Sequence, residues 1–107
     1  MSGITTHVLD TSRGCPAAGV PVVLERAVGS GWDPVGRGST DADGRARDLL
    51  TSAPEPGRYR LIFDTGSYLE AGFYPEVLVT FVVEPGEEHY HVPLLLSPFG
   101  YSTYRGS

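Results

Sequence analysis

Hydrophobic residues in this chain come in short runs that alternate with polar residues, and glycine- or proline-rich segments separate the runs. Alternation with a period of two is typical of β-strands that bury one face. Residues 4–10, 58–64 and 89–97 alternate in this way, and residues 77–83 form the strongest run of strand-forming side chains. The pattern therefore predicts a protein built mainly of short strands.

The remaining strands are predicted from the same pattern and from the turns that bound them. They are residues 20–26, residues 32–40, a short strand after the Asp43-Gly44 turn, and residues 101–105. Residues 84–87 are predicted to be a hairpin connection between the strands 77–83 and 89–97. Seven or eight short strands between turns indicate an all-β protein, an antiparallel two-sheet β-sandwich.

One segment, residues 64–72, departs from the alternation. Thr65 or Ser67 is suited to cap one or two helical turns, and Gly72 is suited to end them. We therefore expect one short helix in addition to the strands.

Length, charge and cysteine content limit the kinds of protein. A chain of 107 residues fits one domain, residues 1–107, around one core. The net charge of −5, without a dense basic run, argues against nucleic acid as a partner. The single Cys15 excludes an internal disulfide, and no signal segment or membrane-length apolar run of about 20 residues is present. A soluble cytoplasmic protein is expected.

Familiar catalytic motifs are absent from the sequence. There is no Gly-x-Ser-x-Gly, no His-Glu-x-x-His and no phosphate-binding glycine-rich loop. The segment 41–44 resembles the middle of a calcium loop, but Leu50 occupies the position that needs a bidentate glutamate. We therefore interpret this segment as a tight Asp-Gly turn.

Two of the three histidines, His7 and His91, are predicted to face away from the core residues of their strands. A solvated surface position is the simplest interpretation of one such histidine. His89 and His91 have the spacing that projects two side chains to one side, as in a zinc site. No third and fourth ligand is evident, so we predict no metal, and we expect His89 to be a solvated residue at the start of its strand.

The carboxyl end carries the most distinctive sequence. Residues 89–101, HYHVPLLLSPFGY, and the closing residues 104–107, YRGS, resemble the transthyretin-like family, specifically its 5-hydroxyisourate hydrolase branch. Transthyretins share the fold and much of this strand but lack the terminal Tyr-Arg-Gly-Ser. Residues outside this segment fit the same transthyretin-like sandwich, including its single short helix.

The resemblance implies a cofactor-free hydrolase of purine catabolism. Its substrate is 5-hydroxyisourate, a flat, oxygen-rich product of urate oxidation, and opening of the lactam ring gives 2-oxo-4-hydroxy-4-carboxy-5-ureidoimidazoline on the route to allantoin. The catalytic residues that it implies are His7, Arg45 and His91. The residues that it places around the substrate are Tyr104, Arg105, Gly106 and Ser107.

Ring opening by water needs a base for the water, a hydrogen-bond donor for the developing oxyanion and a planar group that holds the flat substrate. Histidine suits the first task near neutral pH, and arginine offers a fixed fork of donors for the others. We expect His7 and His91 to hold and deprotonate the water, while Arg45 polarises the carbonyl. Ser107 is expected to orient the substrate. The sequence leaves open which histidine is the base, and Arg47, on the same strand face, is the alternative to Arg45.

The family forms homotetramers, dimers of dimers, whose active sites lie between the dimers. The outward residues expected to form the contact are Leu9, Pro93, Leu95 and Tyr101. Two alternatives stay open: a transthyretin-like carrier of a small hydrophobic ligand, and a β-sandwich interaction module. A carrier has no need of a base and an arginine together, and an interaction module should tolerate loss of the tail.

Overall fold

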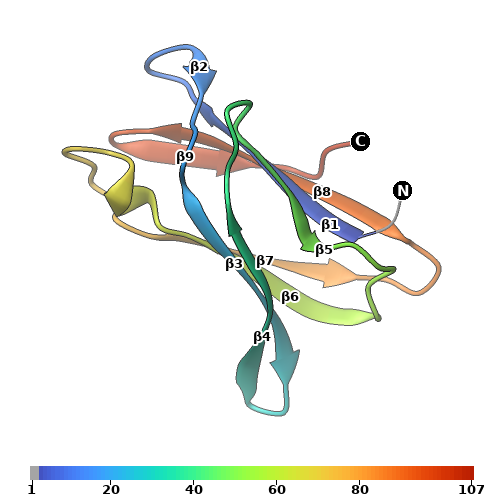
Figure 1. Cartoon of the computed structure of the whole chain (residues 1–107). Helices are drawn as coiled ribbons and strands as arrows, with labels where there is room; N and C mark the ends of the chain where they lie inside the picture. The colour runs from blue at the N-terminus through green and yellow to red at the C-terminus, as the bar shows by residue number, and fades with distance from the viewer. Residues whose placement is uncertain (1–2) are drawn as a thin grey trace.

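The strands form two sheets that share one hydrophobic core (Figure 1). This computed structural model describes residues 3–107. The first sheet contains β1 (Gly3–Asp10), β2 (Cys15–Pro16), β5 (Arg45–Leu50), β8 (His89–Ser97) and β9 (Gly100–Thr103), in the order β2-β1-β8-β9 with β5 also paired to β1. The second contains β3 (Pro21–Val28), β4 (Gly31–Ser39), β6 (Gly57–Phe63) and β7 (Val77–Val83), in the order β4-β3-β6-β7.

The predicted two-sheet all-β architecture is confirmed, with two differences in detail. Residues 3–107 contain nine strands rather than seven or eight, because the two-residue β2, in the segment between β1 and β3, pairs with the end of β1. The first sheet is also not wholly antiparallel, since β1 and β8 run parallel. Alternation along a strand shows which face is buried, but it carries no information about the direction of the neighbouring strand.

The connection over residues 84–87 is not a hairpin, contrary to the prediction. It leads from β7, at the edge of the second sheet, to β8 inside the first sheet. Both sides of β8 are occupied, by β1 and by β9, so β7 has no place beside it. The chain therefore crosses here between the two layers.

The predicted helix is shorter than expected and has a different cap. It is one 3-10 turn, Thr65–Ser67, and the carboxylate of Asp64 accepts a hydrogen bond from the Ser67 backbone N–H at 3.2 Å. Gly66 donates its backbone N–H to the carbonyl oxygen of Pro75 at 2.7 Å, which draws this turn toward a later loop. Across residues 3–107, no helix is long and apolar enough to cross a membrane.

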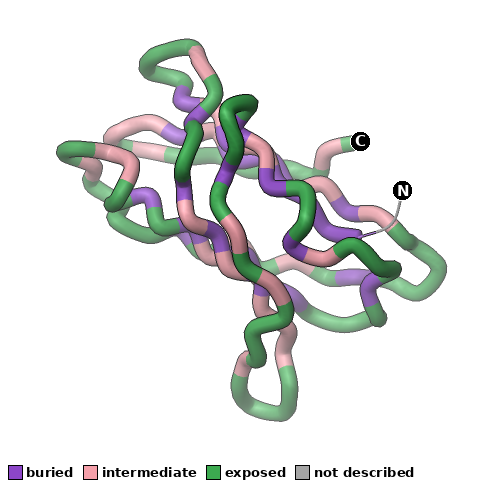
Figure 2. The backbone as a smooth tube through the Cα atoms, viewed as in Figure 1, coloured by how far each residue is buried: buried purple, intermediate pink, exposed green. Residues whose placement is uncertain are grey.

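The core lies between the two sheets, and Figure 2 shows the buried positions recurring along the strands. Residues predicted to point inward on β6 are buried: Tyr59 is 2% exposed, and Leu61 and Phe63 are 0% exposed. From the first sheet, Leu94 and Leu96 of β8 contribute side chains that are 0% and 1% exposed. The side chains on the opposite face of β8 are not needed for the core and can form a site.

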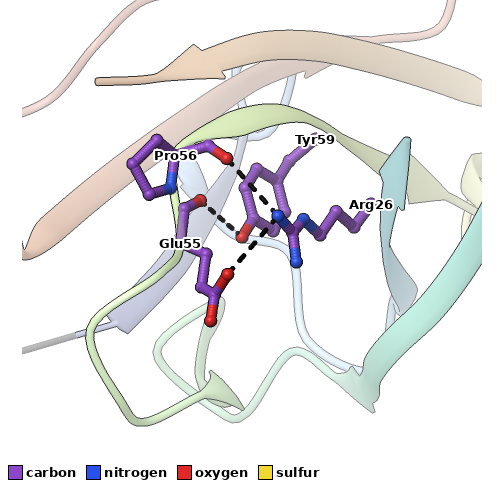
Figure 3. Close-up of polar contacts among 4 residues, drawn as sticks. All are labelled: Arg26, Glu55, Pro56 and Tyr59. Atoms are coloured by element: carbon purple, nitrogen blue, oxygen red, sulfur yellow. Dashed lines mark hydrogen bonds and ion pairs between the residues drawn. The ribbon is translucent and has the colours of Figure 1, made fainter. Parts of the chain in front are cut away.

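A buried tyrosine fixes the loop that precedes β6 (Figure 3). The Tyr59 hydroxyl donates to the Glu55 carbonyl oxygen at 2.8 Å, and Arg26 Nη2 lies 3.4 Å from the Pro56 carbonyl oxygen. Burial raises the pKa of Tyr59, so the hydroxyl keeps its proton and remains a donor. The Arg26–Glu55 ion pair, at 3.7 Å and largely exposed on the glutamate side, adds little stability.

A buried carboxylate closes one end of the sandwich. Asp10, at the end of β1, is 2% exposed and accepts hydrogen bonds from the Tyr68 hydroxyl at 2.8 Å and the Ser12 hydroxyl at 2.9 Å. Burial alone would raise the pKa of this carboxyl, but the hydrogen bonds from Tyr68, Ser12 and the Arg13 backbone outweigh it and lower the pKa. The carboxylate therefore stays ionised and ties the segment after β6 to β1.

Replacing Tyr68 by phenylalanine should lower the free energy of unfolding by about 1.5–3 kcal/mol at pH 7, because the ionised Asp10 loses a hydrogen-bond donor. The folded-state pKa of Asp10 is depressed, so this stabilisation is present above the unfolded pKa of about 3.8 and is lost as the pH falls through the folded pKa. Urea unfolding at pH 7 and pH 3 measures both effects. Tyr101→Phe, at an exposed tyrosine, is the control; an equal loss there, or a Tyr68→Phe loss independent of pH, would contradict the assignment.

Candidate active site

Three strands of the first sheet bring polar side chains to its outer face. In the β1–β5 pairing His7 lies opposite Arg45, and in the β1–β8 pairing Thr5 lies opposite His91. Residues directly opposite on paired strands project to the same face. Because Thr5 and His7 are two residues apart on β1, all four side chains share the face that points away from the core.

A cavity of about 420 Å³ lies on this face. It is lined by Thr5, Thr6, His7, Arg45, Arg47, His89, His91, Pro93, Tyr104, Gly106 and Ser107. Six of the seven site residues expected from the sequence are therefore brought together, and Arg105 is the exception.

A tight turn sets the position of Arg45. The Asp41 carboxylate accepts hydrogen bonds from the backbone N–H groups of Asp43 at 2.9 Å and Arg45 at 3.0 Å. Gly44 has a φ of +76°, and a Cβ atom there would lie 2.5 Å from the carbonyl oxygen of Val8. The predicted Asp-Gly turn is thus confirmed, and its glycine lets the chain pack against β1 so that Arg45 starts β5 opposite His7.

Arg47 also lines the cavity, as the same-face spacing predicted. Its side chain is exposed, whereas Arg45 is partly buried. Arg45 is the arginine opposite His7 in the strand register. The geometry therefore brings two guanidinium groups to the cavity and gives Arg45 the more enclosed position.

His91 is partly buried, and one of its ring nitrogens is engaged within the sheet. Its Nδ1 atom lies 2.8 Å from the Thr5 hydroxyl oxygen, across the β1–β8 pairing. Burial lowers the pKa of His91, and the nearby positive charge of Arg45 lowers it further. The neutral imidazole therefore prevails at neutral pH, and Nε2 is the nitrogen left for the cavity.

The tail after β9 follows β8 in an unbroken register. Leu94 is paired with Thr103 in the ladder, and His91 is paired with Gly106 in an isolated bridge of the same register. Pro93, between them, has no N–H to donate, so the ladder is interrupted there.

Gly106 allows the tail to lie close beside β8. Its backbone N–H donates to the His91 carbonyl oxygen at 2.8 Å. A Cβ atom at this position would lie 2.6 Å from His91 Cδ2 and 3.2 Å from Pro93 Cγ, so a larger residue would displace the tail. The close approach brings Tyr104 and Ser107 to the cavity wall.

Arg105 is not where the sequence placed it. Its guanidinium carbon lies 4.4 Å from the centroid of the Tyr90 ring, and its Nη2 lies 3.6 Å from Glu87 Oε2. The side chain is absent from the lining of the cavity. The register of the tail sets Arg105 opposite Val92, a core-facing residue of β8, so its side chain turns away from the cavity.

His89 and Tyr101 also differ from the sequence prediction. His89 lines the cavity instead of being merely solvated, and its Nδ1 atom is buried with no hydrogen-bond partner within residues 3–107. The i, i+2 spacing to His91 was the signal for this placement. Tyr101 lies opposite Leu96, on the core-facing side of the edge strand β9, and its ring packs edge-on against Tyr74 at 5.3 Å. It is exposed to solvent there, at the sheet edge, and does not share the face of His7 and His91.

The residue types suit hydrolysis of a small polar molecule. A neutral imidazole can accept a proton from water, and a guanidinium can donate to a developing oxyanion. In the described part of the chain, no three side chains among histidine, cysteine, aspartate and glutamate are placed to share a metal ion. The cavity thus combines imidazole and guanidinium groups with the hydroxyls of Tyr104 and Ser107.

Known proteins resemble this chain over nearly its whole length. A sequence model of the HIUase/Transthyretin family matches residues 4–106. A 5-hydroxyisourate hydrolase from Salmonella typhimurium is 50% identical over 109 residues, covering 97% of this chain and 80% of that protein. The structure of Klebsiella pneumoniae 5-hydroxyisourate hydrolase is 38% identical, with a TM-score of 0.86 over 100% of both chains.

Transthyretin itself is also similar in structure. Sea bream transthyretin in complex with thyroxine is 34% identical, with a TM-score of 0.88 over 96% of this chain and 93% of that chain. The fold alone therefore does not separate hydrolases from transthyretins. The match over residues 4–106, together with these identities, establishes that the chain belongs to the HIUase/Transthyretin family.

Proposed function

We propose that this chain is a 5-hydroxyisourate hydrolase of urate degradation. The observation that carries the proposal is the meeting of His7, Arg45 and His91 in one cavity whose wall includes Ser107. The similar proteins from Salmonella typhimurium and Klebsiella pneumoniae bear that name. The product is the ring-opened 2-oxo-4-hydroxy-4-carboxy-5-ureidoimidazoline, and the reaction consumes only water.

The proposed mechanism assigns one task to each side chain. His7 and His91 hold a water molecule, and His91 accepts its proton as the oxygen attacks the lactam carbonyl carbon. Arg45 stabilises the negative charge that forms on the carbonyl oxygen. The carbon–nitrogen bond then breaks, and the proton passes from His91 to the leaving nitrogen. Ser107 orients the substrate.

His91 is the better base because its surroundings keep it neutral. Burial lowers its pKa, and the charge of Arg45 adds to that effect. The 2.8 Å contact between Nδ1 and Thr5 fixes the ring while leaving Nε2 for the water. These features support a base that is unprotonated at the pH of the cell.

A transthyretin-like carrier is the second candidate, favoured by the match to the thyroxine complex. The cavity weighs against it, since the lining contains three histidines and two arginines. A carrier of a hydrophobic ligand gains nothing from a neutral base beside a fixed cation. Thyroxine binding is therefore measured in the same experiments.

The assembly that fits this site is a homotetramer, a dimer of dimers with the active sites between dimers. The cavity lies on the outer face of the first sheet, and Leu9 and Leu95 lie opposite each other on the same face, both partly buried. A second copy packed there would exclude water from the site and cover these leucines.

We propose further that residues 1–107 form one domain and that the enzyme works in the cytoplasm without a cofactor.

Substitution of His91 by asparagine should slow the ultraviolet decay of freshly generated 5-hydroxyisourate by about 10²- to 10⁴-fold, because the general base is lost. Circular dichroism and the oligomer mass of the variant should match those of the wild type. A folded, correctly assembled wild type that does not accelerate the decay over buffer would overturn the proposal. Tight thyroxine binding in that case would establish the carrier.

Replacing Arg45 by glutamine should move the acidic limb of the kcat/KM profile to higher pH, since loss of the nearby charge lets the pKa of His91 rise toward its ordinary value of 6.5. The rate should also fall, because the oxyanion donor is gone. Arg47→Gln is the matched control and should leave the acidic limb in place, since Arg45 is the arginine acting on His91. Equal shifts in both variants would contradict the assignment.

Light scattering of the wild type should give a mass of about 46 kDa, four chains of 11.5 kDa. Leu95→Arg should reduce this mass, because a charge buried between copies is costly. Val35→Arg introduces the same charge at an exposed residue of β4 and should leave the tetramer intact. A monomeric wild type, or an unchanged mass for Leu95→Arg, would refute the proposed interface.

A further inference from the structure

The tail that carries Ser107 is held to β8 by few backbone contacts. Gly106 donates to the His91 carbonyl oxygen at 2.8 Å. Opposite Tyr104, however, Pro93 has no N–H to offer, so the ladder does not continue from β9 into the tail. The position of the last residues must therefore depend on side chains.

Arg105 supplies such a contact from the side opposite to the cavity. The register places it opposite Val92, a core-facing residue of β8, and its guanidinium carbon lies 4.4 Å from the centroid of the Tyr90 ring. Guanidinium groups at this distance from an aromatic face are attracted by the ring quadrupole. The side chain therefore lies against the open edge of the sandwich, between the tail and the core.

Tyr90 is a rigid platform for this contact. Its side chain is 3% exposed, and its hydroxyl accepts a hydrogen bond from the Glu84 backbone N–H at 2.8 Å. Glu87 lies 3.6 Å from Arg105 Nη2, but both side chains are about half exposed, so that ion pair adds little. The stack on Tyr90 is the main side-chain contact of Arg105.

We propose that Arg105 is a positioning residue that clamps the carboxyl-terminal tail onto β8 and thereby holds Tyr104 and Ser107 in the cavity wall. The inference deepens the proposed hydrolase function and rests on it for its kinetic consequence. It replaces the expectation that Arg105 binds the substrate directly. The clamp is a property of the fold, and it can be measured without substrate.

The first experiment measures the clamp itself. Hydrogen exchange of the Gly106 amide, followed by NMR on the full wild-type chain and on Arg105→Ala, reports how often the tail leaves β8. Loss of the stack should speed this exchange by about 5- to 30-fold. Arg58→Ala removes an exposed arginine of β6 and should leave Gly106 exchange unchanged. Unchanged exchange in Arg105→Ala would overturn the proposal.

The second experiment separates positioning from direct binding. Arg105→Ala should lower kcat for 5-hydroxyisourate by about 5- to 30-fold, because the tail then leaves the cavity wall for much of the time. Tyr90→Leu, which changes no residue of the cavity lining, should reproduce this loss, and the double variant should lose no more than either single one. Losses that multiply, or a rise in KM alone, would mean that Arg105 touches the substrate.

The two readouts keep the proposals distinct. If the wild type fails to hydrolyse 5-hydroxyisourate while Arg105→Ala still speeds exchange of the Gly106 amide, the clamp is supported and the hydrolase function is refuted. If the wild type is active and Gly106 exchange is unchanged in Arg105→Ala, the clamp is refuted and the hydrolase function is supported. Should Tyr90→Leu fail to fold, the exchange measured in Arg105→Ala decides alone.

Discussion

The parallel pairing of β1 with β8 is the interaction on which the site depends. It sets Thr5 opposite His91 and His7 opposite Pro93, and so brings residues near the two ends of the chain onto one face. A slip of one residue would turn every side chain of the strand to the other face. The core residues Leu94 and Leu96 resist such a slip, because it would expose them to water. Hydrophobic burial on one face of β8 thus fixes the geometry of the polar face.

Much of this arrangement could be predicted from the pattern of the sequence. Alternation along β1 and β8 directs His7 and His91 away from the core, and the Asp43-Gly44 turn marks where β5 begins. The pattern does not show which strands lie side by side. For this reason residues 84–87 were expected to form a hairpin, although they connect the two sheets. The side to which the Arg105 side chain points depends on how the tail is paired with β8. The tail continues the register of β9, and the sequence alone does not show this register.

The cavity has an electrostatic character opposite to that of the whole protein. The chain carries a net charge of −5, yet the residues around the cavity include Arg45 and Arg47 and no carboxylate side chain. A local positive field draws oxygen-rich or anionic molecules toward the site, and the charge of Arg45 adds to burial in lowering the pKa of His91. The charge of Arg45, which helps to attract the substrate, therefore also helps to keep His91 ready to accept a proton.

The distance along the chain between β1 and β8 also governs when the site can exist. Contacts such as that from Thr5 to His91, 86 residues apart, carry a large loop-closure entropy and belong to the slow-forming class of native contacts. Hairpins such as β3–β4 need no such closure and can form from local sequence alone. A partly folded chain thus keeps His7, Arg45 and His91 apart, and the chemistry of the cavity appears only with the completed fold.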